Sequence, residues 1–151
     1  VLLYQPEIPP NTGNVIRLCA NTGARLHLIK PLGFDLEDKQ LRRAGLDYHE
    51  YATLQVHESL QAALAMIAPQ RLFALSTRGT QRYDQPRYRD GDAFLFGPET
   101  RGLPTDVLDN LPPEQRLRLP MRPGNRSLNL SNSIAVAVFE AWRQMDFAGG
   151  A

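Results

Sequence analysis

The segment from Asn125 to Ser133 gathers neutral hydrogen-bonding side chains directly before an apolar run. Its sequence, NRSLNLSNS, is followed by six apolar residues from Ile134 to Phe139. Part of this pattern is typical of a helix N-cap, for which Ser131 and Asn132 are candidates. Amides and hydroxyls in excess of a cap can also bind a neutral or zwitterionic ligand. The segment therefore predicts a ligand-binding loop that leads into a helix.

Three glycine- or proline-containing loops follow short apolar runs that are typical of buried strands. They are STRG at 76–79, GPETRG at 97–102 and PMRPGNRS at 120–127. In parallel sheets, ligands bind beyond the carboxyl ends of the strands, so three such loops predict a pocket at one edge. Glycine lets a ligand approach the backbone closely, and proline keeps a loop rigid. The chain lacks the G-x-G-x-x-G and G-x-x-x-x-G-K-[ST] patterns, which argues against a dinucleotide or phosphate-loop site.

Arg17 lies between Ile16 and Leu18 on a predicted first helix, NTGNVIRLCANTGA. Its stem could pack on the protein while the guanidinium reaches solvent. Alternatively, together with the nearby asparagines, it could bind a phosphate or a substrate hydroxyl. The residues alone leave both readings open. Cys19, among apolar neighbours, predicts a buried and unreactive thiol, and the three histidines have no metal-ligand spacing.

The elements that must position these residues alternate along the chain. Apolar runs predict strands at 1–4, 26–29, 51–56, 72–75, 93–96 and 116–119. A first helix is predicted with Asn11 or Thr12 as its N-cap, ending at about Asn21, and further helices are predicted at 36–44 before Gly45, 58–68, 104–110 and 131–145. An exposed loop is predicted at 76–91. The alternation predicts an α/β fold, a mostly parallel sheet with helices on both faces.

Length and composition are those of an ordinary globular protein. The 151 residues fit a single domain spanning 1–151, and the net charge is +1. Arginine supplies 15 of the 17 basic residues, and arginine suits bidentate phosphate binding. No apolar stretch approaches the roughly 18 residues of a membrane helix. A single cysteine favours a reducing, cytoplasmic location.

Three motifs, in this order and spacing, resemble the signature motifs of the SPOUT class of RNA 2′-O-ribose methyltransferases. They are NTGNVIRLCANTGA, FGPETRGLP and LPMRPGNRSLNLSNSIAVAVFEAW. The opening YQPEIPPNTGN and the middle LRRAGLDYHEY are similar to the TrmL (YibK) branch of that class. The resemblance implies methyl transfer from S-adenosyl-L-methionine to the 2′-hydroxyl of the wobble nucleotide, cytidine or modified uridine, of leucine tRNAs. A relative acting on another tRNA position or on rRNA, or a catalytically inactive RNA-binding relative, is the alternative.

The same resemblance implies a C-terminal deep trefoil knot, a homodimer, recognition of the tRNA anticodon stem-loop and no metal. Arg17 corresponds to the family's catalytic arginine, with Asn14 and Asn129 orienting it or the ribose. Phe139 stands where relatives often have tyrosine, so no hydroxyl can act there. The residues implied to bind S-adenosyl-L-methionine, and after transfer S-adenosyl-L-homocysteine, are Leu75, Ser76, Thr77, Gly97, Glu99, Gly102, Leu119, Met121, Ser127, Leu128 and Asn129.

Overall fold

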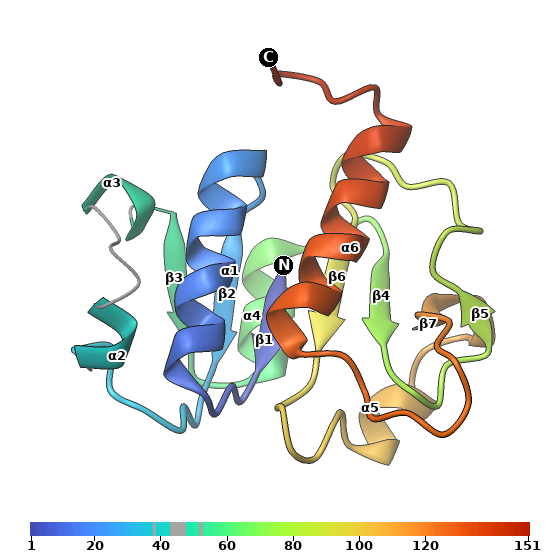
Figure 1. Ribbon diagram of the computed structural model, residues 1–151, viewed down its shortest axis with the longest axis horizontal. Helices are drawn as coiled ribbons and strands as arrows, with labels where there is room; N and C mark the ends of the chain where they lie inside the picture. Colours follow the sequence, from blue (N-terminus) through green and yellow to red (C-terminus); the bar gives the residue numbers. More distant parts are fainter. Residues whose placement is uncertain (38, 43–47, 52) are drawn as a thin grey trace.

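A parallel β-sheet organises the chain in the computed structural model, which describes residues 1–37, 39–42, 48–51 and 53–151 (Figure 1). In this part of the chain seven strands follow the order β3-β2-β1-β6-β4-β7-β5, and every neighbouring pair is parallel. The predicted parallel α/β fold is therefore confirmed. The strands are β1 (Leu2–Tyr4), β2 (Leu26–Ile29), β3 (Leu54–His57), β4 (Leu72–Leu75), β5 (Gln81–Arg82), β6 (Ala93–Phe96) and β7 (Arg116–Arg118).

Helices cover both faces of the sheet, as predicted. α1 and α6 pack against each other on one face, and α4 and α5 lie behind the sheet in Figure 1. Among the described residues, no helix has the length and apolarity needed to cross a lipid bilayer. The helices are α1 (Pro9–Thr22), α2 (Lys39–Arg42), α3 (Tyr48–Tyr51), α4 (Leu60–Ile67), α5 (Thr105–Asp109), the 3-10 helix η1 (Pro113–Gln115) and α6 (Leu130–Gln144).

Alternation along each strand divides the core into two layers. Leu3 and Phe94 face α1 and α6, whereas their neighbours Leu2 and Leu95 face α4 and α5. Each large apolar side chain removed from water in this way contributes about 1.5–3 kcal/mol. Cys19 is buried in the first layer, and burial raises the pKa of its thiol to about 11. The prediction of an unreactive cysteine is thus supported by the structure.

The predicted N-cap of the first helix is wrong by three to four residues. α1 begins at Pro9, with Ile8 as its N-cap, and it ends before Gly23 in the left-handed conformation. Asn11 and Thr12 therefore do not cap the helix but are buried within it. Proline fits the first helical positions because its missing N–H would have no helical partner there. The predicted stop at Gly45 lies outside the described residues.

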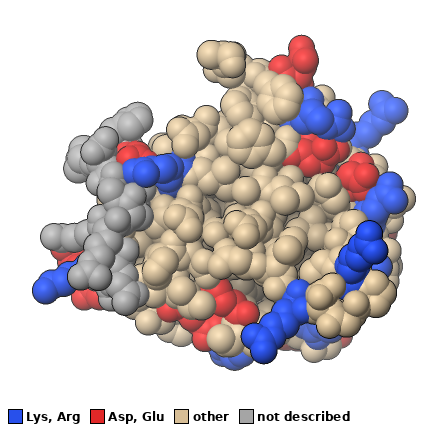
Figure 2. All heavy atoms as spheres, viewed as in Figure 1, with Lys and Arg blue, Asp and Glu red and all other residues tan. Residues whose placement is uncertain are grey.

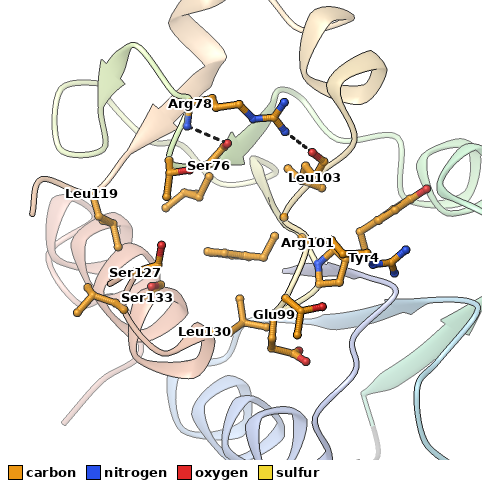
Figure 3. Close-up of a pocket in the computed structure, with 18 of the residues that line it drawn as sticks. Tyr4, Ser76, Arg78, Glu99, Arg101, Leu103, Leu119, Ser127, Leu130 and Ser133 are labelled. Carbon is orange, nitrogen blue, oxygen red and sulfur yellow. Dashed lines mark hydrogen bonds between the residues drawn. The ribbon is translucent and has the colours of Figure 1, made fainter. Parts of the chain in front are cut away.

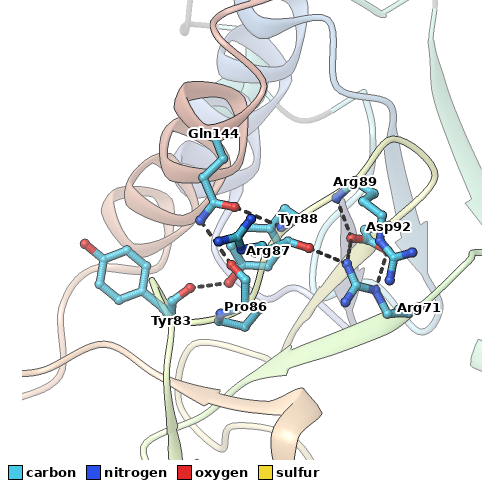
Figure 4. Close-up of polar contacts among 8 residues, drawn as sticks. All are labelled: Arg71, Tyr83, Pro86, Arg87, Tyr88, Arg89, Asp92 and Gln144. Atoms are coloured by element: carbon cyan, nitrogen blue, oxygen red, sulfur yellow. Dashed lines mark hydrogen bonds and ion pairs between the residues drawn. The ribbon is translucent and has the colours of Figure 1, made fainter.

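The segment 76–91 is not the wholly exposed loop that the sequence predicts. It contains the short strand β5, which pairs with β7, and the buried side chain of Tyr88. The side chain of Gln144 in α6 accepts a hydrogen bond from the Tyr88 N–H (2.9 Å) and donates one to the carbonyl of Pro86 (3.1 Å) (Figure 4). These contacts hold the segment against the C-terminal helix. The ring of Tyr88 also contacts the aromatic core at Phe73.

The same region is held at its base by a bidentate ion pair. Arg71 donates to both carboxylate oxygens of Asp92, at 3.1 and 2.7 Å, and to the carbonyl of Arg87 at 2.6 Å (Figure 4). Its guanidinium lies 4.9 Å from the centre of the Phe73 ring. Arg71 thus stacks on an aromatic ring and also binds one carboxylate through two nitrogens, a combination that lysine could not make.

Candidate functional site

A cavity of about 850 Å³ opens at the carboxyl edge of the sheet, beyond β4, β6 and β7. The first loop (76–79), the second loop (97–102) and the third loop (120–127) all contribute to its lining. Figure 3 shows Leu119, Ser127 and Ser133 on one side and Leu103 and Arg101 on the other. The predicted convergence of three loops at one sheet edge is therefore confirmed.

Every residue that the family resemblance assigns to the cofactor lines this cavity. The set comprises main-chain positions and neutral side chains from the three loops together with one carboxylate. Its members are Leu75, Ser76, Thr77, Gly97, Glu99, Gly102, Leu119, Met121, Ser127, Leu128 and Asn129. Among the described residues, no group of three histidines, cysteines or carboxylates is arranged to hold a metal ion.

The first loop is tied to β7 and to the segment after the second loop. The Ser76 N–H donates to the carbonyl of Leu117 (3.0 Å), and the backbone at Gly79 packs so closely on that strand that a Cβ would overlap it. The guanidinium of Arg78 donates to Thr105 Oγ1 (2.8 Å) and to the carbonyl of Leu103 (Figure 3). Two walls of the cavity are thus joined by one arginine.

The second loop is a compact turn built on two glycines. A Cβ on Gly97 would overlap main-chain atoms of Gly102 and Leu103. Gly102 has φ of +68°, a region that favours glycine, and its N–H donates to the carbonyl of Pro98 (2.9 Å). The loop therefore depends on both glycines for its shape.

Glu99, at the centre of the second loop, faces the entry to α1. Its carboxylate accepts hydrogen bonds from the N–H groups of Glu7 and Ile8. Burial raises the pKa of this carboxyl group, and the two backbone donors oppose that rise. The sequence leaves two roles open for Glu99, an anchor for the loop or a ligand contact, and this geometry favours the anchor.

Asn129 joins the third loop to α6 and to α1. Its side-chain oxygen accepts from the N–H of Ser131 (2.9 Å), so Asn129 is the N-cap of α6, and the prediction of Ser131 or Asn132 is wrong. Its amide nitrogen donates to Oδ1 of Asn11 (3.0 Å). Asn11 is buried and lines the cavity. The sequence interpretation missed this residue as part of the site because it treated Asn11 as a helix cap.

The structure does not bring Asn14 and Arg17 into the cavity lining with Asn129. Asn14 is exposed on α1. The Arg17 side chain is 47% exposed, and its guanidinium donates to both carboxylate oxygens of Glu50, at 3.0 and 3.4 Å. Of the predicted catalytic residues, Asn129 lines the cavity, whereas Asn14 and Arg17 lie on α1 outside its lining.

The third loop is open to solvent. Its residues are exposed. The sequence predicts that Leu128 and Leu130 pack this loop down. That prediction is wrong for Leu128, which is 46% exposed, whereas Leu130 packs against the core. The loop therefore presents both polar and apolar side chains at the cavity mouth.

Comparison with known proteins agrees with this arrangement. The profile of the SpoU rRNA methylase family matches residues 1–139. The chain belongs to this family. A tRNA (cytidine(34)-2′-O)-methyltransferase of Methylovorus glucosotrophus is 67% identical over 149 residues, which cover 99% of this chain and 97% of the relative.

Two solved structures of the SpoU methylase group show the same fold. One, which reports on the 2-OH methylation of C/U34 on tRNA, has a TM-score of 0.87 and 49% identity, covering 96% of this chain and 94% of that chain. The other is AviRb from Streptomyces viridochromogenes in complex with the cofactor AdoMet. It has a TM-score of 0.81 and 21% identity, covering 99% of this chain and 58% of that chain. At that identity the second likeness is one of fold.

Proposed function

We propose that this SpoU-family chain transfers a methyl group from S-adenosyl-L-methionine to the 2′-hydroxyl of the wobble nucleotide of leucine tRNAs. The observation that carries the proposal is the cavity, which gathers all eleven residues expected at the cofactor from three separate loops. The relative from Methylovorus, named for action at cytidine 34, supports the wobble position. We further propose one knotted domain over 1–151, working in the cytoplasm on the tRNA anticodon stem-loop.

The residues of the cavity fit this cofactor chemically. A volume of about 850 Å³ lies within the usual range for small-molecule sites. The lining offers backbone groups at Gly97 and Leu119 and hydroxyls at Ser76 and Ser127, which suit adenine, ribose and a zwitterionic amino acid. When bound, S-adenosyl-L-methionine supplies an electrophilic methyl group on a sulfonium ion.

The residues of this chain would hold the ribose hydroxyl in line with that methyl group. Methyl transfer from a weakly acidic alcohol needs in-line positioning and removal of a proton. Arg17 is a poor base because an arginine guanidinium is not deprotonated in proteins. We therefore assign Arg17 to the neighbouring phosphate or to the developing alkoxide. Because Arg17 does not line the cavity, the bound RNA must extend from the cavity mouth to Arg17.

We also propose that the enzyme is a homodimer that uses the exposed face of α6. Val136 and Phe139 are 39% and 44% exposed on this helix. Figure 2 shows that uncharged residues cover the middle of the face over α1 and α6, with charged residues toward its rim. Apolar surface of this kind is typical of an interface. Light scattering should give twice the chain mass, and a strict monomer would refute this part of the proposal.

The activity is tested by incubating the protein with labelled cofactor and total tRNA and then mapping the modified nucleoside. We expect a 2′-O-methylated wobble nucleotide in leucine tRNAs. Label at another tRNA position or in rRNA would overturn the wobble assignment. Failure of calorimetry to detect cofactor binding would overturn the enzyme proposal itself.

The role of Arg17 has a matched control in the same chain. Arg17→Ala should abolish methyl transfer and leave the affinity for S-adenosyl-L-methionine unchanged, because Arg17 does not line the cavity. Arg82 forms an exposed ion pair with Asp84 at 2.5 Å, and it lies outside both the cavity lining and α6. Arg82→Ala should retain activity. Loss of cofactor affinity in Arg17→Ala would contradict the assigned role.

A further inference from the structure

Two carboxylates connect the segment before α1 to the second loop in a reciprocal way. Glu99 Oε2 accepts from the N–H groups of Glu7 (2.9 Å) and Ile8 (2.7 Å). Glu7 Oε1 accepts from the N–H (3.0 Å) and the hydroxyl (2.8 Å) of Thr100. We call these four residues the carboxylate clamp. Residues more than 90 positions apart in the sequence are joined by charge-assisted hydrogen bonds, which are about twice as strong as neutral ones.

The clamp compensates for a helix start that cannot cap itself. Ile8 has no side-chain acceptor, and Pro9 and Pro10 have no N–H to donate. The Glu99 carboxylate binds the last free donors before the helix and lies near its positive end. The N–H groups that Glu99 binds stabilise its charge, and this offsets the repulsion from the nearby Glu7 carboxylate.

The clamp forms part of the cavity wall. Its residues Ile8, Glu99 and Thr100 line the cavity, as do the glycines of the second loop, whereas Glu7 lies outside the lining. On the other side the clamp fixes the first turn of α1, which carries Asn11 and its hydrogen bond to Asn129. One set of contacts therefore fixes the relative position of two cavity walls.

We propose that Glu7 is a positioning residue for cofactor binding. It acts through Thr100 on the main chain of the second loop, and it holds the first turn of α1 in register with that loop. Hydrogen bonds from the Thr100 N–H and hydroxyl lower the pKa of the Glu7 carboxyl group, so Glu7 is charged at neutral pH. The proposal rests on the proposed function, since it concerns the same cavity.

The test compares Glu7→Ala with Glu7→Gln, which keeps an acceptor oxygen for Thr100. Calorimetry with S-adenosyl-L-methionine should show affinity about tenfold weaker for Glu7→Ala and within about threefold of wild type for Glu7→Gln. Steady-state assays should show the loss in KM for the cofactor, with kcat at saturation and tRNA affinity nearly unchanged. Glu114→Ala, which removes an exposed carboxylate outside the cavity, is the matched control and should bind normally.

A purely structural role for Glu7 predicts a different pattern. It would lower the urea midpoint of Glu7→Ala while the folded protein kept wild-type cofactor affinity, and that result would overturn the inference. Thr100→Val removes the hydroxyl donor and keeps the N–H, so it tests the clamp even if Glu7→Ala does not fold. We expect weaker cofactor binding in Thr100→Val, and unchanged affinity would also overturn the inference. Absence of binding to the wild-type protein would instead refute the proposed function.

Discussion

Asn129 offers the sharpest test of how the site is assembled, because its amide oxygen and its amide nitrogen make separable contacts. Its oxygen caps α6 through the N–H of Ser131, and its amide nitrogen donates to the buried Oδ1 of Asn11. An N-cap contributes about 1 kcal/mol to stability. Loss of a partner for a buried polar atom costs about 1–3 kcal/mol, and the lower value applies here because Asn11 borders the cavity.

Two substitutions separate these contacts. Asn129→Ala removes both and should lower the free energy of unfolding by about 2 kcal/mol. Asn129→Ser keeps a good capping oxygen but is too short to reach Asn11, so it should lose only about 1 kcal/mol. Methyl transfer should fall in both variants, since both release Asn11 at the cavity.

The assay is urea unfolding at one fixed protein concentration, because the stability of the proposed dimer would depend on concentration. The slope of the transition should stay constant while the midpoint moves in the order wild type, Asn129→Ser, Asn129→Ala. Equal midpoints for the two variants would show that the contact with Asn11 contributes nothing. A wild-type midpoint for Asn129→Ala would refute both assignments.

Four further substitutions or conditions test other features. Gly97→Ala should cost about 1–3 kcal/mol by overpacking and should reduce cofactor affinity in calorimetry, because the new Cβ overlaps the main chain of Leu103. Thr12→Val should raise the free energy of unfolding in urea by about 1 kcal/mol, because the buried Thr12 hydroxyl has no hydrogen-bond partner among the described residues. Ser127→Ala should weaken cofactor binding and leave the midpoint unchanged, since Ser127 is exposed at the cavity. Burial lowers the pKa of His27 to about 4 from an ordinary 6.5, so between these pH values it is mainly the unfolded chain that gains a proton at His27. Stability should therefore fall as the pH drops from 6.5 toward 4, and the urea midpoints at pH 7 and pH 5 should differ less in His27→Gln than in wild type.

Most of the sheet could be predicted because its buried strands can be recognised from the local sequence. A strand buried on both faces is a short apolar run, and β4, β6 and β2 match the predicted runs residue for residue. β5 has no such signal, since Gln81 and Arg82 are polar and pair only with β7 at the sheet edge. The direction of the loops then follows from the sheet, which is why the place of the cavity could be predicted as well.

The details of the site escaped prediction where they depend on contacts distant in sequence. The start of α1 is bound by Glu99, more than 90 residues away, so a search for a local cap found Asn11 or Thr12 instead. The same error hid the role of Asn11, whose partner Asn129 is 118 positions away. Glu50 lies 33 residues from Arg17, and no local pattern indicates that ion pair.

Helix α1 links the two parts of the proposed site. Its first turn is fixed by the carboxylate clamp and carries Asn11 into the cavity, whereas Arg17 lies six residues beyond Asn11. A helix rises 1.5 Å per residue, so this offset is about 9 Å along the axis. We therefore expect the reacting ribose at the cavity and a neighbouring phosphate of the RNA at Arg17. The rigidity of α1 sets the distance between these two positions, and the clamp sets where that rigid link begins.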